Sequence, residues 1–128
     1  MKDRSTLYMH YLLDLAKKPK NYGLLSRSDF CSHQVNPSCG DSMAVCGLIE
    51  EDKIWQARFE ASGCVLSIAM ASLLTEHITG MTVQDALLLN DQTVEQLLKI
   101  PLGINRLQCG MLSVIALQAG LRKYKGLV

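Results

Sequence analysis

Helical spacing of apolar residues near the start of the chain gives way to a loop and then to a short extended segment. Leucine and alanine side chains recur through residues 7–18, which predicts a short helix that Pro19 ends. Residues 31–35 are predicted as a short strand. The strand runs into residues 36–41, where Asn, Pro and Gly favour a tight turn.

An alternation of apolar and polar residues follows and predicts an antiparallel hairpin. Residues 42–49 and 54–60 each alternate with a period of two, and the polar residues 50–53 lie between them. Trp55 and Phe59 fall on the same side of the second run. We expect both aromatic side chains to pack there rather than to form a binding surface.

The second half of the chain is predicted to be helical. Residues 64–77 are apolar nearly all round, which is typical of a buried helix. Thr82 and Thr93 are predicted N-caps of two short helices, and a last helix covers residues 106–123 with Ile115 facing inward. The whole order predicts an α+β fold, in which a small antiparallel sheet of about three strands packs against several helices.

Composition limits the classes of function that need to be considered. The 128 residues are expected to form one domain, 1–128, and 48% apolar with 20% charged residues is ordinary for a globular protein. A net charge of +1 gives no reason to propose nucleic acid or an anionic membrane as a partner. The charged N-terminus does not resemble a signal peptide, so we expect a cytoplasmic protein.

Cysteines carry the candidate chemistry. The chain has five, and an odd number in a reducing compartment favours metal or sulfur chemistry over a disulfide framework. Cys39 lies in the predicted turn, Cys64 follows Gly63 at a strand-to-helix junction, and Cys109 is expected in the first turn of the last helix. Helix N-termini favour thiolate, and the Asp41 carboxylate is nearby in sequence. Three sulfurs and one oxygen suit zinc or a loosely held iron–sulfur cluster.

The spacing of these cysteines does not by itself define a metal site. The gaps of 25 residues from Cys39 to Cys64 and 45 residues from Cys64 to Cys109 match no short zinc-binding motif. Free cysteines are also commonly buried as small apolar residues. From spacing alone, both interpretations of Cys39, Cys64 and Cys109 stay open.

Three motifs together resemble the NifU/IscU scaffold family. Asn-Pro-Ser-Cys-Gly-Asp at residues 36–41 resembles the first cysteine motif of that family, and Gly-Cys at residues 63–64 with the helix through residue 76 resembles the second. Leu-Gln-Cys at residues 107–109 resembles the third. The likeness extends over roughly residues 8–121 and keeps both cysteine spacings.

The resemblance implies an IscU/SufE-like fold and a scaffold rather than an enzyme. Such a scaffold receives persulfide sulfur from a cysteine desulfurase and iron from elsewhere, builds a labile [2Fe–2S] cluster, and transfers it to apo-proteins. Cys39, Asp41, Cys64 and Cys109 would hold the cluster. Two alternatives keep the same residues: a zinc-dependent sulfur acceptor of the desulfurase, and a degenerate relative in which zinc is only structural.

The chain departs from the IscU branch at two places. Gln108 stands where that branch has a histidine before the third cysteine, which makes Asp41 the better candidate for the fourth ligand. Residues 102–106 replace a Leu-Pro-Pro-Val-Lys motif, so no contact with the chaperone that recognises this motif is predicted. His33 is weighed as a substitute for that histidine against the ordinary interpretation of a solvated or hydrogen-bonded side chain, and Cys31 is weighed as a residue that approaches the site.

Overall fold

The computed structural model describes residues 4–38, 40–100 and 102–127 and confirms the α+β fold. In chain order its elements are α1 (Arg4–Lys17), β1 (Phe30–Val35), β2 (Ser42–Glu50), β3 (Lys53–Ser62), α2 (Val65–Ile78), α3 (Val83–Leu87), α4 (Asp91–Leu98) and α5 (Ile104–Lys125). Among these described helices, none has the length and apolarity that a membrane span requires.

The three strands form one antiparallel sheet in the order β1-β2-β3. The predicted hairpin is confirmed, and its turn consists of Glu51 and Asp52, which both have positive φ values of 51° and 64°. Two residues with positive φ suit a tight hairpin because their twist matches that of the strands. At the other end of the hairpin, Ser42 pairs with Ser62, so the segments that flank them are neighbours.

A bulge in β3 corrects one sequence prediction. Leu48 pairs with Gln56 whereas Ile49 pairs with Ile54, which leaves Trp55 as the extra residue on β3. The shift turns Ile54 into the core and leaves Trp55 52% exposed, so the prediction that Trp55 packs inside was wrong. Phe59 lies beyond the bulge and is buried, as the alternation predicted.

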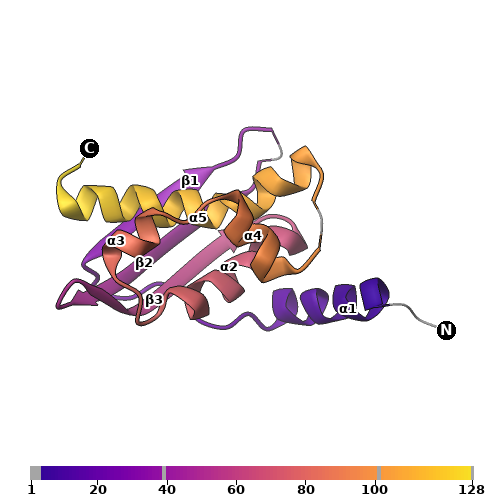
Figure 1. Ribbon diagram of the computed structural model, residues 1–128, viewed down its shortest axis with the longest axis horizontal. Coiled ribbons are helices and arrows are strands. Elements are labelled where there is room, and N and C mark those ends of the chain that lie inside the picture. The colour runs from indigo at the N-terminus through magenta and orange to yellow at the C-terminus, as the bar shows by residue number, and fades with distance from the viewer. Residues whose placement is uncertain (1–3, 39, 101, 128) are drawn as a thin grey trace.

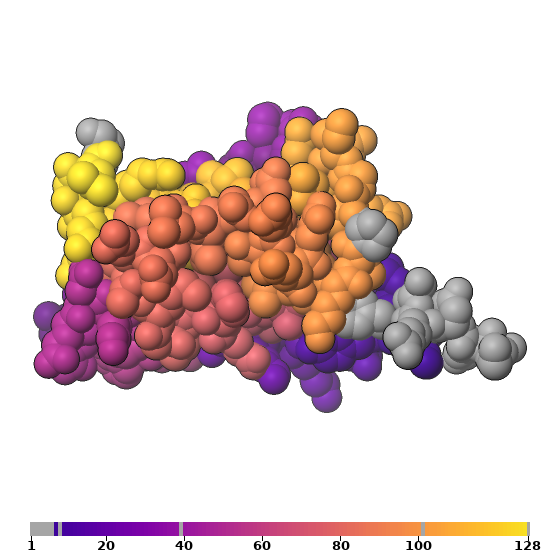
Figure 2. All heavy atoms as spheres, in the orientation of Figure 1, coloured from indigo at the N-terminus to yellow at the C-terminus, as the bar shows by residue number. Residues whose placement is uncertain are grey.

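The helices cover one face of the sheet in a layer. α5 packs against β1 and β2, α2 packs against β3 and α5, and α1 lies along α2 at the edge (Figure 1). The second half of the chain, salmon to yellow, covers the face seen in Figure 2. The core between these layers contains Met43 and Phe59 from the sheet, and Leu74 and Leu117 from α2 and α5.

One of the two predicted N-caps is confirmed and the other is not. Thr82 caps α3 by accepting a hydrogen bond from the Asp85 N–H, as expected. α4 is capped by Asn90 instead of Thr93, and the Thr93 hydroxyl accepts the Asn90 N–H to complete a capping box. The N-cap prediction for Thr93 was therefore wrong by one turn.

α5 is longer at both ends than the sequence predicted. It begins at Ile104, so Cys109 lies in its second turn and not in its first. The helix dipole therefore favours the Cys109 thiolate less than expected, because the unpaired N–H groups belong to the first turn. Ile115 is 45% exposed, which contradicts its predicted inward orientation, whereas Leu112 and Ala116 are buried.

Candidate metal centre

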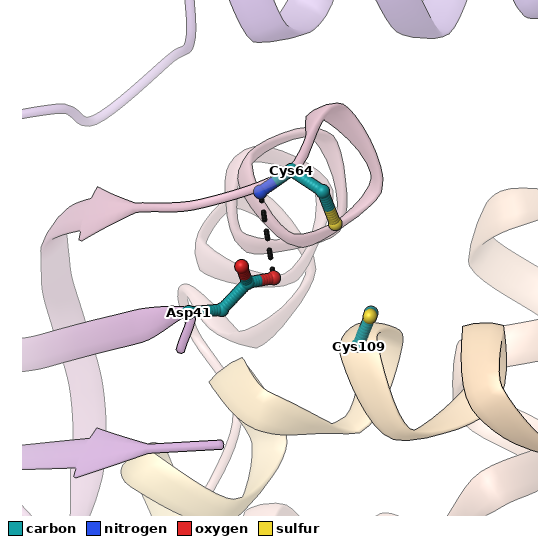
Figure 3. A group of neighbouring side chains, drawn as sticks. All are labelled: Asp41, Cys64 and Cys109. Carbon is teal, nitrogen blue, oxygen red and sulfur yellow. Dashed lines mark hydrogen bonds between the residues drawn. The ribbon is translucent and has the colours of Figure 1, made fainter. Parts of the chain in front are cut away.

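Asp41, Cys64 and Cys109 come together at one end of the sheet. A carboxylate oxygen of Asp41 and the two Sγ atoms all lie within 4.8 Å of one another. Figure 3 shows the three side chains directed into the same space from the start of β2, the start of α2 and the second turn of α5. Cys39, the third predicted cysteine ligand, lies outside the described residues.

The hairpin places Asp41 beside Cys64. Because Ser42 pairs with Ser62, Asp41 and Gly63 emerge side by side from β2 and β3. A Cβ atom on Gly63 would lie 2.4 Å from the Asp41 Cγ, which is closer than two such atoms can approach. Gly63 is therefore the residue that lets the Asp41 carboxylate lie against the backbone just before Cys64.

The Asp41 carboxylate is buried and accepts hydrogen bonds from α2 and its N-cap. The Cys64 N–H donates to Oδ2 at 3.4 Å, and the Ser67 hydroxyl donates to the same oxygen at 2.9 Å. Cys64 is also the N-cap of α2, so the carboxylate lies at the positive end of that helix. Hydrogen bonds to a carboxylate and a nearby helix N-terminus favour its charged form, which is the form that binds metal, whereas burial opposes it.

Ser67 is a site residue that the sequence interpretation missed. Its hydroxyl lies 2.9 Å from Asp41 Oδ2, 3.3 Å from Cys64 Sγ and 3.2 Å from the Cys109 backbone oxygen, so it touches all three segments. The side chain is buried. The available signal was a serine in an apolar helix one turn after a candidate ligand cysteine, on the same helix face.

The donor set fits a tetrahedral metal ion or a cluster with mixed ligands. Four ligands about 2.3 Å from one zinc ion lie about 3.8 Å apart, so donors already within 4.8 Å need only small side-chain movements. Two sulfurs with one oxygen also resemble the ligands of an iron–sulfur site with one weaker ligand. Cys64 is exposed and Cys109 half-buried, which leaves the sulfurs accessible to a partner.

The candidate substitute His33 and the nearby cysteine Cys31 both lie outside the group formed by Asp41, Cys64 and Cys109. His33 and Cys31 are exposed on β1, and the group of potential metal ligands found among the described residues includes neither of them. Gln108 is exposed and lines an open cavity between α5 and the end of β1. Asp41, the candidate for the fourth ligand in the absence of a histidine at position 108, lies beside the Cys64 and Cys109 sulfurs.

Comparison with known proteins gives one consistent family. Residues 7–128 match the model of the NifU-like N-terminal domain. The zinc-dependent sulfurtransferase SufU of Bacillus subtilis is 29% identical, over 94% of this chain and 93% of that protein. Iron sulfur cluster assembly protein 1 of Trachipleistophora hominis is 32% identical, over 92% of this chain and 86% of that protein.

Solved structures agree on the fold. The crystal structure of a putative iron–sulfur cluster assembly scaffold protein for the SUF system from Fervidobacterium islandicum AW-1 superposes with a TM-score of 0.78 at 23% identity, and it covers 93% of this chain and 99% of that one. The matched family model, the curated relatives and the shared α+β architecture lead to one conclusion. The chain belongs to the family of NifU-like N-terminal domains, which includes the IscU-like scaffolds.

Proposed function

We propose that this chain is a single-domain scaffold for iron–sulfur cluster assembly. The observation that carries the proposal is the convergence of Asp41, Cys64 and Cys109 at one end of the sheet, in a family whose relatives are named as assembly scaffolds. Together with Cys39, these residues would supply four ligand positions for a [2Fe–2S] cluster, which is the cargo of the scaffold. The chain itself catalyses no reaction in this proposal.

Cluster assembly requires sulfur, iron and electrons from other proteins. A cysteine desulfurase transfers sulfane sulfur to a cysteine of the site as a persulfide. Each sulfane sulfur then takes up two electrons from an external reductant to become sulfide, and the cysteine thiolate is regenerated. The exposure of Cys64 supports this role, because a partner must reach at least one sulfur to deliver its cargo.

Asp41 is proposed to keep the cluster transferable. A carboxylate is a harder and weaker ligand for cluster iron than a thiolate, so an incoming cysteine of an apo-protein can displace it. The hydrogen bonds from Ser67 and from the Cys64 N–H hold Asp41 Oδ2, and they would retain the carboxylate in the site after it leaves the iron. Release would then proceed one ligand at a time.

A zinc-dependent sulfur acceptor is the second candidate function. One similar protein, SufU of Bacillus subtilis, carries the name of a zinc-dependent sulfurtransferase. The Asp41, Cys64 and Cys109 donors also fit tetrahedral zinc. In this alternative one cysteine leaves zinc, attacks the sulfane sulfur of the desulfurase persulfide, and releases the desulfurase thiolate. The persulfide sulfur is passed on without any cluster being formed.

Anaerobic reconstitution with ferrous iron, cysteine, a thiol reductant and a desulfurase tests the scaffold function. We expect visible cluster absorption that is lost in the Cys64→Ser and Cys109→Ser variants and that moves to an added apo-ferredoxin in the native chain. Cys31→Ser is the matched control, because Cys31 lies outside the site and its variant should keep the bands. A colourless protein, or bands that survive both site substitutions, would contradict the scaffold function.

Desulfurase turnover separates the zinc-dependent alternative from the scaffold. If the chain is a zinc-dependent acceptor, zinc added to the apo-protein should greatly raise cysteine consumption by the desulfurase, and Cys64→Ser should abolish the increase. The desulfurase with zinc but without this chain provides the control. Unchanged turnover in the presence of zinc-loaded protein would remove the alternative.

Ser67→Ala tests whether the hydroxyl orients the Asp41 carboxylate. Loss of a residue that positions a ligand typically weakens metal affinity by about 10–100-fold, so we expect a drop of this size in zinc affinity measured by chelator competition. Ser113→Ala is the matched control, because its hydroxyl is buried and has no hydrogen-bond partner among the described residues. Equal zinc affinities of the two variants would show that Ser67 has no positioning role.

A further inference from the structure

Two cysteines that the proposed metal site does not use face each other across the sheet. In the register of β1 and β2, Cys31 is the direct partner of Cys46. Asn36 N–H donates to the Asp41 backbone oxygen, which makes that pair a hydrogen-bonded one. Hydrogen-bonded and non-hydrogen-bonded pairs alternate along antiparallel strands. Cys31 and Cys46 lie five positions away and therefore form a non-hydrogen-bonded pair.

This type of pair has the geometry that a disulfide needs. Directly opposed residues at a non-hydrogen-bonded position have Cα atoms about 4.5 Å apart. Disulfides occur at Cα separations of roughly 4.4–6.8 Å, so the strand spacing typical of this pair type lies within the disulfide range. The two side chains lie on the same face of the sheet, because directly paired residues of antiparallel strands project to the same side.

The two sulfurs differ in their access to solvent. Cys31 is exposed, whereas Cys46 is 1% exposed. The Leu25 N–H donates to Cys46 Sγ at 3.4 Å, which places the segment after Gly23 over this thiol. Arg58, the partner of Cys46 on β3, donates to the backbone oxygens of Tyr22 and Gly23 and so anchors that segment. A reagent from solvent therefore meets Cys31 first.

From this arrangement we infer that Cys31 and Cys46 form a dithiol site that reacts with low-molecular-weight disulfides of the glutathione class. Cys31 thiolate attacks one sulfur of the disulfide RSSR, forms a mixed disulfide and releases RS⁻, which takes up a proton. Cys46 then loses its proton and attacks the Cys31 sulfur, which forms the cross-strand bond and releases the second RS⁻. In total the protein gives up two electrons and two protons, and RSSR becomes two RSH.

The pKa of the Cys31 thiol influences both the rate and the product of this reaction. Desolvation raises the pKa of Cys31, and the neighbouring Cys46 raises it further. The first step is therefore slow at neutral pH, because little thiolate is present to attack. The same raised pKa means that the reduced pair gains little from ionisation, which favours the disulfide over the dithiol at equilibrium.

The dithiol site is separate from the proposed metal site. Cys46 is five residues along β2 from Asp41, which at about 3.4 Å per residue is about 17 Å. Cys46 also alternates with Met43 and Val45, which face the helices, so its side chain lies on the outer face of the sheet. Oxidation of this pair can therefore be measured whether or not the chain assembles clusters.

The test uses the Cys39→Ser, Cys64→Ser, Cys109→Ser variant, in which Cys31 and Cys46 are the remaining cysteines. It is treated with glutathione disulfide at mildly alkaline pH and analysed by intact mass spectrometry. We expect the loss of two hydrogen atoms with no glutathione attached. Adding Cys46→Ser should trap one glutathionyl group on Cys31, and adding Cys31→Ser instead should leave the buried Cys46 unmodified.

Several results would overturn the inference. A stable glutathione adduct with Cys46 present, an absence of reaction, or equal reaction of the two added variants would each contradict it. If circular dichroism shows that the triple variant is unfolded, the native chain is oxidised, alkylated and digested instead. A crosslinked peptide that joins Cys31 to Cys46 is then expected, and crosslinks of either residue to Cys64 or Cys109 in its place would contradict the inference.

Discussion

The contact between the Asp41 carboxylate and the backbone at Gly63 is the constraint on which the site depends. It joins the start of β2 to the start of α2, and it exists because Gly63 has no side chain at a point where a Cβ would overlap the carboxylate. The Cys64 N–H and the Ser67 hydroxyl then fix one carboxylate oxygen. The Ser67 hydroxyl also lies 3.2 Å from the Cys109 backbone oxygen, so α5 packs against the same point.

This arrangement explains how a small sheet can support the candidate metal centre. Asp41 is attached to the paired end of the hairpin, and Cys64 and Cys109 are attached to two helices that pack on each other within the core. Rigid elements hold donor atoms more closely than loops do, which lowers the cost of binding metal. The thiols nevertheless remain partly accessible, so a stable fold would not prevent exchange of the cargo in the proposed scaffold.

Much of the fold was predictable because its signals are local. Alternation identified the hairpin, and Pro19, Gly63 and Thr82 marked ends and starts of elements. The misplaced residues have causes beyond local pattern. Because of the bulge at Trp55, the residues of β3 near the turn face the opposite sides of the sheet from those that the alternation predicts. The N-cap position of α4 is occupied by Asn90 and not by Thr93.

The site was only partly predictable. The family resemblance and the acidic residue beside a turn pointed to Asp41, and the structure places it with Cys64 and Cys109. Ser67 could not be assigned from sequence, because its role depends on the packing of α2 against α5. The direct pairing of Cys31 with Cys46 likewise depends on the register of β1 and β2, and a slip of one residue would remove this pairing.

The lifetime of a reconstituted cluster in the Asp41→Ala variant tests the central claim most directly. If Asp41 is the displaceable ligand, its loss should make the bound cluster persist several-fold longer during transfer to an apo-ferredoxin than in the native chain. Asp91→Ala is the matched control, since Asp91 is an exposed carboxylate at the start of α4. A shorter cluster lifetime in Asp41→Ala than in both the native chain and the control would contradict the account.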